Sequence, residues 1–338
     1  MTDIKPFDFR RDWKQFCQLY QKTFGREVNK AYCDWKFLNN PFGEAFGFAA
    51  WDNNKLIGFV SVWPLRFCFD GEEIIACSGA DTMVDIEYRK QGLFTKLTQI
   101  LLEEMNKRGW LFRYSAPGIM SYPGYIKKLN HQLIDILPYR VKFHPVRMIY
   151  KKLFNNLNKK IDSHFTCSYH NLTVRTVDKF DNVFDLLWDD TKSRFRLSVQ
   201  RSSHFLNWRY CQHPFHSYLI LSCEDKNDLV GFAIIRGGNL VELWGKRDLN
   251  IYMALLNSAE QLWKTAGQVI THSWFMGDHL IEIALKKSGW RNYTFRRRPL
   301  GLYLEQPLIC CGNPDFRNST AIFDSSTWRF SMGDVDFM

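Results

Sequence analysis

The segment from Tyr88 to Thr95 gives the clearest chemical signal in the sequence. It reads Tyr-Arg-Lys-Gln-Gly-Leu-Phe-Thr and lies between an apolar, strand-like segment and an amphipathic, helix-like one. A turn from a strand into a helix leaves backbone N–H groups free at the start of the helix, and such groups bind phosphate. Gly92 lets the backbone approach an anion closely, while Arg89 and Lys90 add positive charge. These residues predict a phosphate-binding turn.

The elements that must position this turn follow from the periodicity of the apolar residues. Helical spacing over residues 9–24 and again over 94–108 predicts two amphipathic helices, each followed by a glycine. Polar turns at 52–55 and 70–71 separate apolar segments and predict two β-hairpins between the helices. The chain should therefore run helix, three or four antiparallel strands, helix and strand, with the turn just before the second helix.

A local pattern occurs twice in the chain. The letters WKF begin at Trp35 and NPF at Asn40, whereas WRY begins at Trp208 and HPF at His213, an offset of 208 − 35 = 173 residues. Each copy leads into a strand, a polar turn and an apolar strand with one internal glycine. The ordered pair of matches predicts a degenerate tandem duplication.

A polar and basic segment over residues 151–164 separates two stretches with richer apolar patterning. We interpret it as the connection between a first domain over 1–150, which contains the turn, and a second, degenerate domain over 165–305. Residues 306–338 should form a C-terminal tail packed on the body. The alternative interpretation of residues 151–164 is an exposed helical excursion within one domain.

Composition and charge limit the class of protein. The 338 residues amount to two typical domains, and 45 Lys and Arg against 35 Asp and Glu give a net charge of +10. This charge favours anionic partners such as phosphorylated cofactors, but without a concentrated basic and aromatic stripe we do not expect nucleic acid. The nine cysteines include no Cys-x-x-Cys, so we predict neither a disulfide framework nor a metal site. Lacking a leader and an apolar run that could cross a bilayer, the chain should be cytoplasmic, with no membrane partner.

The letters RKQGLF at 89–94, in this order of elements, resemble the Arg-x-x-Gly-x-Gly/Ala motif of the GCN5-related N-acetyltransferases (GNAT). The segments YCDWKFLNNPFG, GADTMVDIEYRKQGLFTKL and SYPGYIKKLNHQ look like a bacterial branch of this superfamily with two acetyltransferase-like domains. The resemblance implies an α+β fold of tandem GNAT-like domains, each a mixed, mostly antiparallel twisted sheet flanked by helices. It covers residues 8–135 well and 200–295 only as a similar fold. Phe94 stands where the motif has Gly or Ala, and Ile86 where many members carry proline.

The resemblance also implies a cofactor and its binding residues. Acetyl-CoA would be the acyl donor, with no metal involved. In this family the strand before the turn splays from its neighbour, which would leave backbone groups of Met83 and Val84 free for the pantetheine arm. The phosphates would lie on the turn, formed by Arg89, Lys90, Gln91, Gly92, Leu93, Phe94 and Thr95.

Acyl transfer to an amine needs a neutral nucleophile, so a base or a water relay must remove a proton near the thioester. Asp81 and Asp85 are four residues apart and therefore on one face of the strand before the turn. We predict Asp81 as the base because it lies deeper in the apolar stretch, where a carboxylate without a role is costly. The alternative is a hydrogen-bonded structural aspartate or a turn cap.

In many relatives a tyrosine in a context like Tyr-x-Lys-x-Gly, in the helix after the next strand, protonates the leaving thiolate. Here the letters YIKKLNH place Ile126 at the matching position and Tyr125 one residue earlier. Tyr122 and Tyr125 are therefore our candidate general acids, and packing in the core is the alternative for either of them.

The second half lacks the Arg-x-x-Gly pattern, because residues 245–250 read Gly-Lys-Arg-Asp-Leu-Asn. We infer that this half has lost cofactor binding and supports the first half or shapes the acceptor site. The end of the tail is aromatic and acidic, and we expect Asp334 or Asp336 to reach the acceptor cleft.

These residues together predict an acetyl-CoA-dependent N-acetyltransferase that acylates an amine of a small molecule or sugar. One alternative is an aminoacyl transferase of the peptidoglycan-bridge type, against which the intact turn argues. The other is a non-catalytic acyl-CoA-binding module, which the displaced tyrosine and the net charge of +10 leave open.

Overall fold

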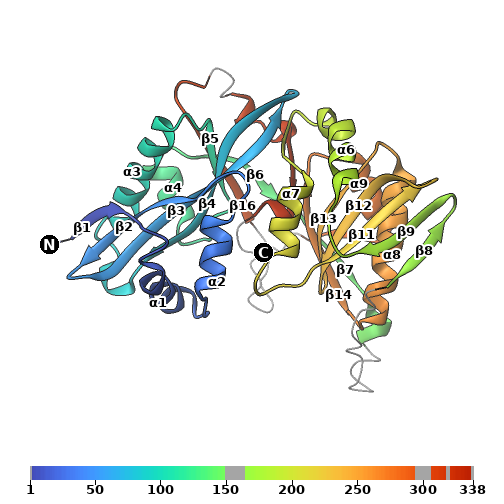
Figure 1. Cartoon of the computed structure of the whole chain (residues 1–338), viewed down its shortest axis with the longest axis horizontal. Coiled ribbons are helices and arrows are strands. Elements are labelled where there is room, and N and C mark those ends of the chain that lie inside the picture. The colour runs from blue at the N-terminus through green and yellow to red at the C-terminus, as the bar shows by residue number, and fades with distance from the viewer. Residues whose placement is uncertain (1, 149–163, 294–305, 317–319, 336–338) are drawn as a thin grey trace.

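The computed structural model describes residues 2–148, 164–293, 306–316 and 320–335. Two sheet-containing halves lie side by side along the long axis of the molecule, and the last described segment of the chain lies between them (Figure 1). The N-terminus lies at the outer end of the first half. Within the described residues, no helix is long and apolar enough to cross a membrane.

Among the described residues, the sheet of the first half has the strand order β1, β2, β3, β4, β5, β16, β6, in which β4 and β5 are parallel neighbours. The strands are β1 (Asp3–Pro6), β2 (Phe46–Asp52), β3 (Lys55–Phe69), β4 (Glu72–Val84), β5 (Phe112–Ser115), β6 (Gln132–Leu137) and β16 (Gln306–Gly312). The helices are α1 (Trp13–Phe24), α2 (Lys30–Cys33), the π-helical turn η1 (Asp34–Leu38), η2 (Ile86–Tyr88), α3 (Leu93–Lys107) and α4 (Tyr122–Lys128). Ala50 packs with α3 and its neighbour Ala49 with α1, so these two helices cover opposite faces of the sheet.

The sheet of the second half repeats this arrangement. As far as the structure describes it, its order is β8, β9, β11, β12, β13, β14, β7, β15, and β13 and β14 are again parallel neighbours. The strands are β7 (Tyr139–Phe143), β8 (Thr166–Tyr169), β9 (Leu172–Val177), β11 (Leu219–Asp225), β12 (Asp228–Arg236), β13 (Asn239–Gly245), β14 (Ile270–Met276) and β15 (Arg291–Asn292). The helices are α6 (Asn182–Thr191), η3 (Lys192–Arg194), α7 (Ser203–Leu206), the π-helical turn η4 (Asn207–Cys211), α8 (Leu249–Thr265) and α9 (His279–Lys287).

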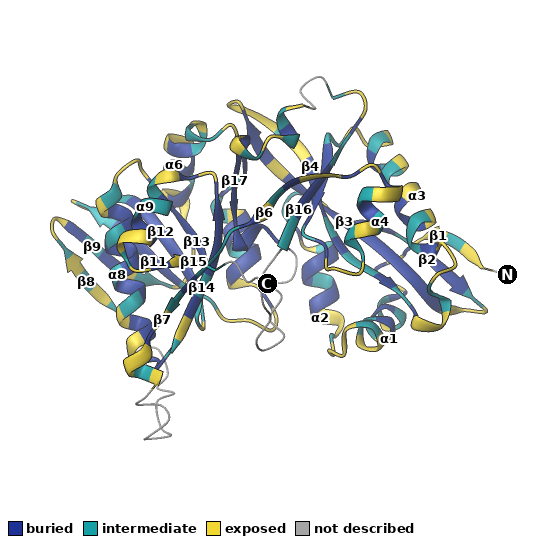
Figure 2. Ribbon diagram, turned by 180° about the vertical axis from the view of Figure 1, so that it is seen from behind, coloured by how far each residue is buried: buried dark blue, intermediate teal, exposed yellow. Residues whose placement is uncertain are grey.

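The periodicity of the sequence locates most elements of the first half. The helix predicted over 94–108 is α3, and the one predicted over 9–24 is α1, which begins at Trp13 after a turn. The apolar segments assigned to two separate hairpins form one continuous strand, β3, which pairs with β2 and with β4. Figure 2 shows that the central strands of both sheets are buried along most of their length.

The halves exchange strands. Strand β7 follows β6 in the chain but lies between β14 and β15 of the second half, while β16 comes from the tail and lies between β5 and β6 of the first. The ranges 1–150 and 165–305 remain our prediction for the domains, and each sheet contains a strand from outside its range. Local periodicity gives no information on such pairings, because the partners are far apart in sequence.

The repeated tryptophans form the contact between the halves. Trp35 Nε1 donates to the carbonyl oxygen of Trp208 at 2.7 Å, and Trp208 Nε1 donates to that of Trp35 at 2.8 Å. Their rings are stacked with centroids 5.3 Å apart. Each tryptophan lies in a π-helical turn, η1 or η4, after a short helix. The motif found at an offset of 173 residues is thus a reciprocal contact between equivalent elements.

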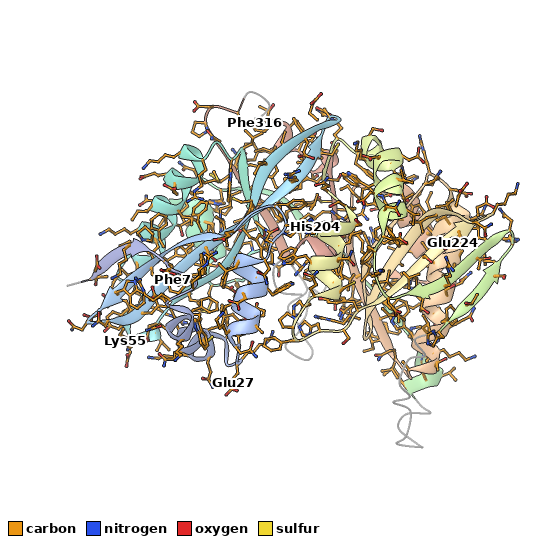
Figure 3. The ribbon with its side chains drawn as sticks, viewed as in Figure 1. Phe7, Glu27, Lys55, His204, Glu224 and Phe316 are labelled. Carbon is orange, nitrogen blue, oxygen red and sulfur yellow. The ribbon has the colours of Figure 1, made fainter. Side chains whose placement is uncertain are left out.

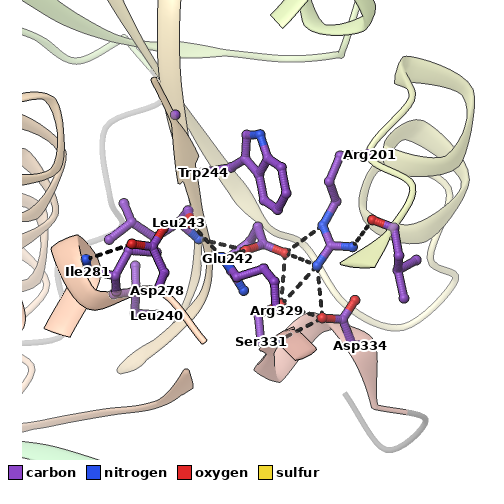
Figure 4. Close-up of polar contacts among 12 residues, drawn as sticks. Arg201, Leu240, Glu242, Leu243, Trp244, Asp278, Ile281, Arg329, Ser331 and Asp334 are labelled. Carbon is purple, nitrogen blue, oxygen red and sulfur yellow. Dashed lines mark hydrogen bonds and ion pairs between the residues drawn. The ribbon is translucent and has the colours of Figure 1, made fainter. Parts of the chain in front are cut away.

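The C-terminal segment runs between the halves. It comprises η5 (Ala321–Phe323), η6 (Ser325–Thr327), β17 (Trp328–Ser331) and η7 (Met332–Asp334), and β17 pairs with β14 and with the short strand β10 (Leu197–Val199), itself paired with β3. Arg329 donates to Glu242 at 2.8 Å, and Arg201 Nη2 donates to Asp334 Oδ2 at 2.8 Å (Figure 4). All four side chains are buried.

Our expectation for the acidic tail was wrong for Asp334. Its carboxylate accepts hydrogen bonds from Arg201 and from the backbone N–H of Ser331, so it is part of a buried ion-pair network and does not line a cleft. Asp336 lies outside the described residues.

We predict that Trp35→Ala lowers the free energy of unfolding by about 3–5 kcal/mol, because it removes a buried ring and one of the reciprocal hydrogen bonds. Urea titration followed by circular dichroism measures the change. As a control, Phe24→Ala removes a ring that is 46% exposed and should change stability by less than about 0.5 kcal/mol. A loss below about 1 kcal/mol for Trp35→Ala would show that this contact does not join the halves.

Candidate active site

Strands β4 and β5 stay paired over a short distance. Cys77 lies opposite Arg113 and Ser78 opposite the next residue, after which β4 continues to Val84 beside β3 alone. Where parallel strands separate, the polar backbone groups on their inner edges lose their strand partners. We call the region between residues 79–84 of β4 and the end of β5 the β4–β5 split.

A β-bulge lies on the β4 side of this split. Between Phe59 and Ser61 of β3, strand β4 contains one extra residue, and Asp81 has a φ of +39°. A bulge changes the direction in which neighbouring side chains point. Asp81 and the adjacent Thr82 contact groups on opposite faces of the sheet, as successive residues of a strand do.

The side chain of Asp81 lies on the face covered by α1 and α2. Its Oδ2 is 2.6 Å from Nζ of Lys36, and the two side chains are 6% and 1% exposed. Lys36 belongs to η1, donates to the hydroxyl of Tyr32 at 3.1 Å and lies over the ring of Trp63. This buried ion pair fixes the orientation of Asp81, and its role as a base stays a prediction.

Tyr125 reaches the β4–β5 split from the opposite face. Its ring is buried, and its hydroxyl oxygen is 3.0 Å from Thr82 Oγ1 on β4. Arg113 of β5 donates from Nη2 to the same hydroxyl at 3.1 Å. Tyr125 therefore contacts both strands where they separate, which is the position we expect for a group that acts on a ligand between them.

His131 forms a hydrogen bond with the guanidinium nitrogen of Arg113 that does not contact Tyr125. Burial and, to a lesser extent, the charge of Arg113 lower the pKa of His131 to about 3, so the ring is neutral at physiological pH. Its Nε2 lies 2.9 Å from Arg113 Nη1, a donor, and must accept. Its Nδ1 then carries the hydrogen and donates to the carbonyl oxygen of Leu129 at 2.9 Å.

The second tyrosine candidate, Tyr122, packs in the apolar cluster beside Tyr125. Tyr122, at the start of α4, is partly buried against the cluster formed by Tyr125, Leu129 and Ile309. Phe94 joins the same cluster, with its ring edge-on to Tyr125 at a centroid distance of 4.9 Å. Packing of Phe94 between α3 and α4 is the physical consequence of a large residue where the motif has Gly or Ala.

The predicted turn has the backbone geometry of an anion site. Lys90 and Gly92 are in the left-handed region, with φ of +64° and +79°. Helix α3 begins at Leu93, and its first hydrogen bond runs from Lys96 N–H to Gly92 O. The preceding N–H groups, including that of Thr95, therefore have no partner within the helix. Lys90, Gln91 and Gly92 are exposed, and Leu93 is buried.

We expected backbone groups of Met83 and Val84 to be free for the pantetheine arm, and the structure differs at Val84. The carbonyl oxygen of Val84 accepts a hydrogen bond from Arg89 Nε at 3.2 Å and is not free. Met83 lies opposite Phe59 of β3, with its side chain in the core. A pantetheine arm that used the Val84 carbonyl would have to displace Arg89.

Asp85, the other acidic residue before the turn, caps η2. Its carboxylate accepts from the backbone N–H of Glu87 and lies 2.8 Å from Lys22 Nζ and 3.2 Å from Lys55 Nζ. Burial opposes its ionisation, but the hydrogen bonds from Lys22, Glu87 and Lys55 outweigh it and lower its pKa. Figure 3 shows Lys55 at the outer end of the first half. Asp85 thus has a structural role that supports the turn.

Sequence reasoning missed three residues of the site, namely Thr82, Arg113 and His131. One signal for Arg113 was available, since it is the single charge in the apolar segment LFRYSA at 111–116. A charge in a buried strand requires partners and marks a candidate functional position. Those partners lie on α4 and the loop after it, and nothing in the strand itself identifies them.

A cavity of about 880 Å³ lies elsewhere, lined by residues 6–11 and 44–48 and by α3 from Ile100 to Arg108. It is at the opposite end of α3 from the turn. Four of its charged groups are paired with each other, in the ion pairs of Arg10 with Glu44 and of Arg108 with Glu104. We place the site at the β4–β5 split because the buried side chains that can donate or accept a proton lie there.

Among the described residues, no group of His, Cys, Asp or Glu could hold a metal ion.

The equivalent place in the second half is filled by the chain itself. Strands β13 and β14 pair only at Asn239 and His272, and β17 lies against β14 beyond that point. Arg329 of β17 donates to the carbonyl oxygen of Leu243 on β13 at 2.7 Å. Gly277 leaves no room for a side chain, since a Cβ there would lie 1.7 Å from the carbonyl oxygen of Trp328.

The split in the first half has different groups on its two faces. Tyr125 and Thr82 are on the face of α3 and α4, whereas Asp81 and Lys36 are on the face of α1 and α2. A thioester between the strands would have a proton donor on one side and a carboxylate on the other. This arrangement suits acyl transfer, in which the leaving group gains a proton and the nucleophile loses one.

Comparison with known proteins gives the family. A model described as an acetyltransferase (GNAT) domain matches residues 5–130. N-alpha-acetyltransferase 30 of Schizosaccharomyces pombe is 33% identical over 111 residues, which are 32% of this chain and 68% of that protein.

Solved structures extend the similarity to nearly the whole chain. A GCN5-related N-acetyltransferase from Anabaena variabilis has a TM-score of 0.60 at 13% identity, over 92% of this chain and 72% of that one. Saccharomyces cerevisiae N-myristoyltransferase with bound myristoyl-CoA has a TM-score of 0.58 at 11% identity, over 91% and 77%. The predicted α+β fold with a mixed sheet and flanking helices is confirmed. This chain belongs to the GNAT acetyltransferase family and is an acyltransferase.

Proposed function

We propose that this protein transfers an acetyl group from acetyl-CoA to an amine, with the donor lying across the turn from Arg89 to Thr95 and in the β4–β5 split. The observation that carries the proposal is the hydroxyl of Tyr125, which contacts Thr82 and Arg113 where β4 and β5 separate. The turn that starts α3 follows this part of β4 directly. A cofactor could therefore reach from the turn to Tyr125 along one strand.

We assign Tyr125 as the general acid and Asp81 as the base. As the bond between sulfur and the acyl carbon breaks, the Tyr125 hydroxyl gives its proton to the thiolate. On the other face, Asp81 removes the proton of the attacking amine directly or through water, and Lys36 holds the carboxylate in place. Acetyl-CoA supplies the thioester and its leaving group.

The acceptor we propose is an amine of a small molecule or a sugar. The name of the fission-yeast relative indicates a second candidate, an α-amine, and the yeast structural neighbour is an N-myristoyltransferase. A screen should therefore include amino sugars, polyamines and peptides with free N-termini. The aminoacyl transferase and the non-catalytic binding module remain the alternatives.

We also propose that the chain consists of two GNAT-like units and that the second has lost cofactor binding. Support comes from the equivalent strand orders of the two sheets and from the reciprocal contact of Trp35 and Trp208. Occupation of the β13–β14 region by β17 supports the loss of binding.

Gly92→Trp should weaken acetyl-CoA binding at least tenfold, because a bulky side chain would cover the N–H groups at the start of α3. Calorimetric titration of the unchanged protein should give micromolar binding, about −8 kcal/mol. Gly71→Trp is the matched control. It also replaces an open, left-handed glycine, with φ of +90° against +79°, in a distant hairpin. Equal binding by Gly92→Trp and Gly71→Trp would rule out the turn as the phosphate site.

Tyr125→Phe should lower kcat about 10²–10⁴-fold with a smaller change in the KM for acetyl-CoA, because it removes the proton donor and keeps the ring. Tyr122→Phe should change kcat less than about twofold, because the hydroxyl that contacts Thr82 and Arg113 belongs to Tyr125. Release of the CoA thiol measures both rates. If Tyr125→Phe keeps its kcat, or Tyr122→Phe loses it, the assignment of the acid is wrong.

Asp81→Asn should destabilise the protein by about 3–5 kcal/mol, because it leaves the Lys36 ammonium buried without its carboxylate. Adding Lys36→Met should restore most of this stability, since removing both charges of a buried pair is often neutral. The double variant separates the contribution of Asp81 to stability from its contribution to kcat. It should remain inactive if Asp81 is the base, and recovery of kcat together with stability would leave Asp81 only its structural role.

A further inference from the structure

Arg113 is the least expected group in the site. It lies inside β5 and is 1% exposed. Removing a guanidinium from water is costly unless an opposite charge compensates it. Within the described residues, no carboxylate forms an ion pair with Arg113, and its guanidinium forms hydrogen bonds with His131 and Tyr125.

The fold makes room for this side chain at the point where β4 and β5 separate. A Cβ at Gly79 would lie 2.1 Å from Arg113 Nη2 and 2.2 Å from Ser115 Oγ. Any larger residue at position 79 would push the guanidinium out of the split. The guanidinium carbon also lies 4.9 Å from the centre of the Tyr125 ring, a cation–π contact that holds the ring.

The chemistry of the donors fixes the direction of each hydrogen bond. A guanidinium has only donors, so the Tyr125 oxygen accepts from Arg113 and its own hydrogen must point elsewhere. The other hydrogen-bond partner of that hydroxyl is Thr82 Oγ1, at 3.0 Å on the β4 side of the split. The neutral His131 accepts at the far end and prevents the guanidinium from turning away.

We propose that Arg113 is a positioning residue for acyl transfer, which directs the hydroxyl hydrogen of Tyr125 toward β4 and into the split. The inference rests on the proposed role of Tyr125 as general acid. As the amine nitrogen bonds to the acyl carbon and the bond between sulfur and that carbon breaks, the Tyr125 proton moves to the sulfur, and the electron pair of the O–H bond stays on the phenolic oxygen. The adjacent guanidinium stabilises that oxygen. The proton that Asp81 removes from the amine passes to solvent, and a proton from solvent restores the Tyr125 hydroxyl.

The test is a double-mutant cycle on the full chain, with thiol release from acetyl-CoA as the assay. The acceptor is the best amine of the screen, or water if no amine reacts. Arg113→Met should lower kcat at least tenfold and leave the KM for acetyl-CoA within about threefold, because it disturbs the acid and not the turn. Combined with Tyr125→Phe, the same change should have almost no further effect on kcat, since the group through which Arg113 acts is gone.

Arg113→Lys should recover part of kcat because it restores a donor and a charge but not the fork that reaches both His131 and Tyr125. It also serves as the test variant if Arg113→Met does not fold. Arg140→Met is the matched control, since Arg140 is also mostly buried but pairs with Glu282 in the second half. Its kcat should stay unchanged.

The outcomes separate this inference from the proposed function. Loss of kcat in Tyr125→Phe with none in Arg113→Met would overturn the role of Arg113 and keep Tyr125 as the acid. Additive losses in the double variant would overturn it as well, because Arg113 would then act independently of Tyr125. Unchanged kcat in Tyr125→Phe would contradict the proposed role of Tyr125 as the general acid, on which this inference rests.

Discussion

The separation of β4 from β5 after two pairs of residues is the constraint on which the site depends. Buried backbone and side-chain polar groups need partners, and parting strands remove them. The chain supplies substitutes from its own side chains, with Arg89 on the Val84 carbonyl and Arg113 between His131 and Tyr125. The side chains that form hydrogen bonds with the polar groups of the split are thus also the side chains that a ligand bound there would contact.

The second half meets the same constraint in another way. Beyond the single pairing of β13 and β14, the inner edge of β13 is covered by the C-terminal segment, and Arg329 donates to the Leu243 carbonyl much as Arg89 does to Val84. Glu242 neutralises Arg329 and Arg201 there. One half therefore closes its strand gap with a backbone segment, while the other closes it with side chains.

Sequence alone could predict what local patterns encode. The turn at Gly92 and helix α3 follow from glycine, charge and periodicity, and the Trp35 and Trp208 motif follows from its repetition. The exchange of β7 and β16 could not be predicted, because strand pairing between distant segments leaves no local periodicity. The same holds for Arg113 and for Asp334, whose roles depend on partners from remote elements, His131 in one case and Arg201 in the other.

The most direct test of this account is a crystal structure of the full chain with CoA. We predict that the sulfur lies between β4 and β5 within hydrogen-bond reach of the Tyr125 hydroxyl, about 3–3.5 Å, with the pyrophosphate on the N–H groups at the start of α3. A cofactor bound in the cavity between residues 6–11 and the far end of α3 would contradict the account. So would a CoA whose sulfur lies away from Tyr125.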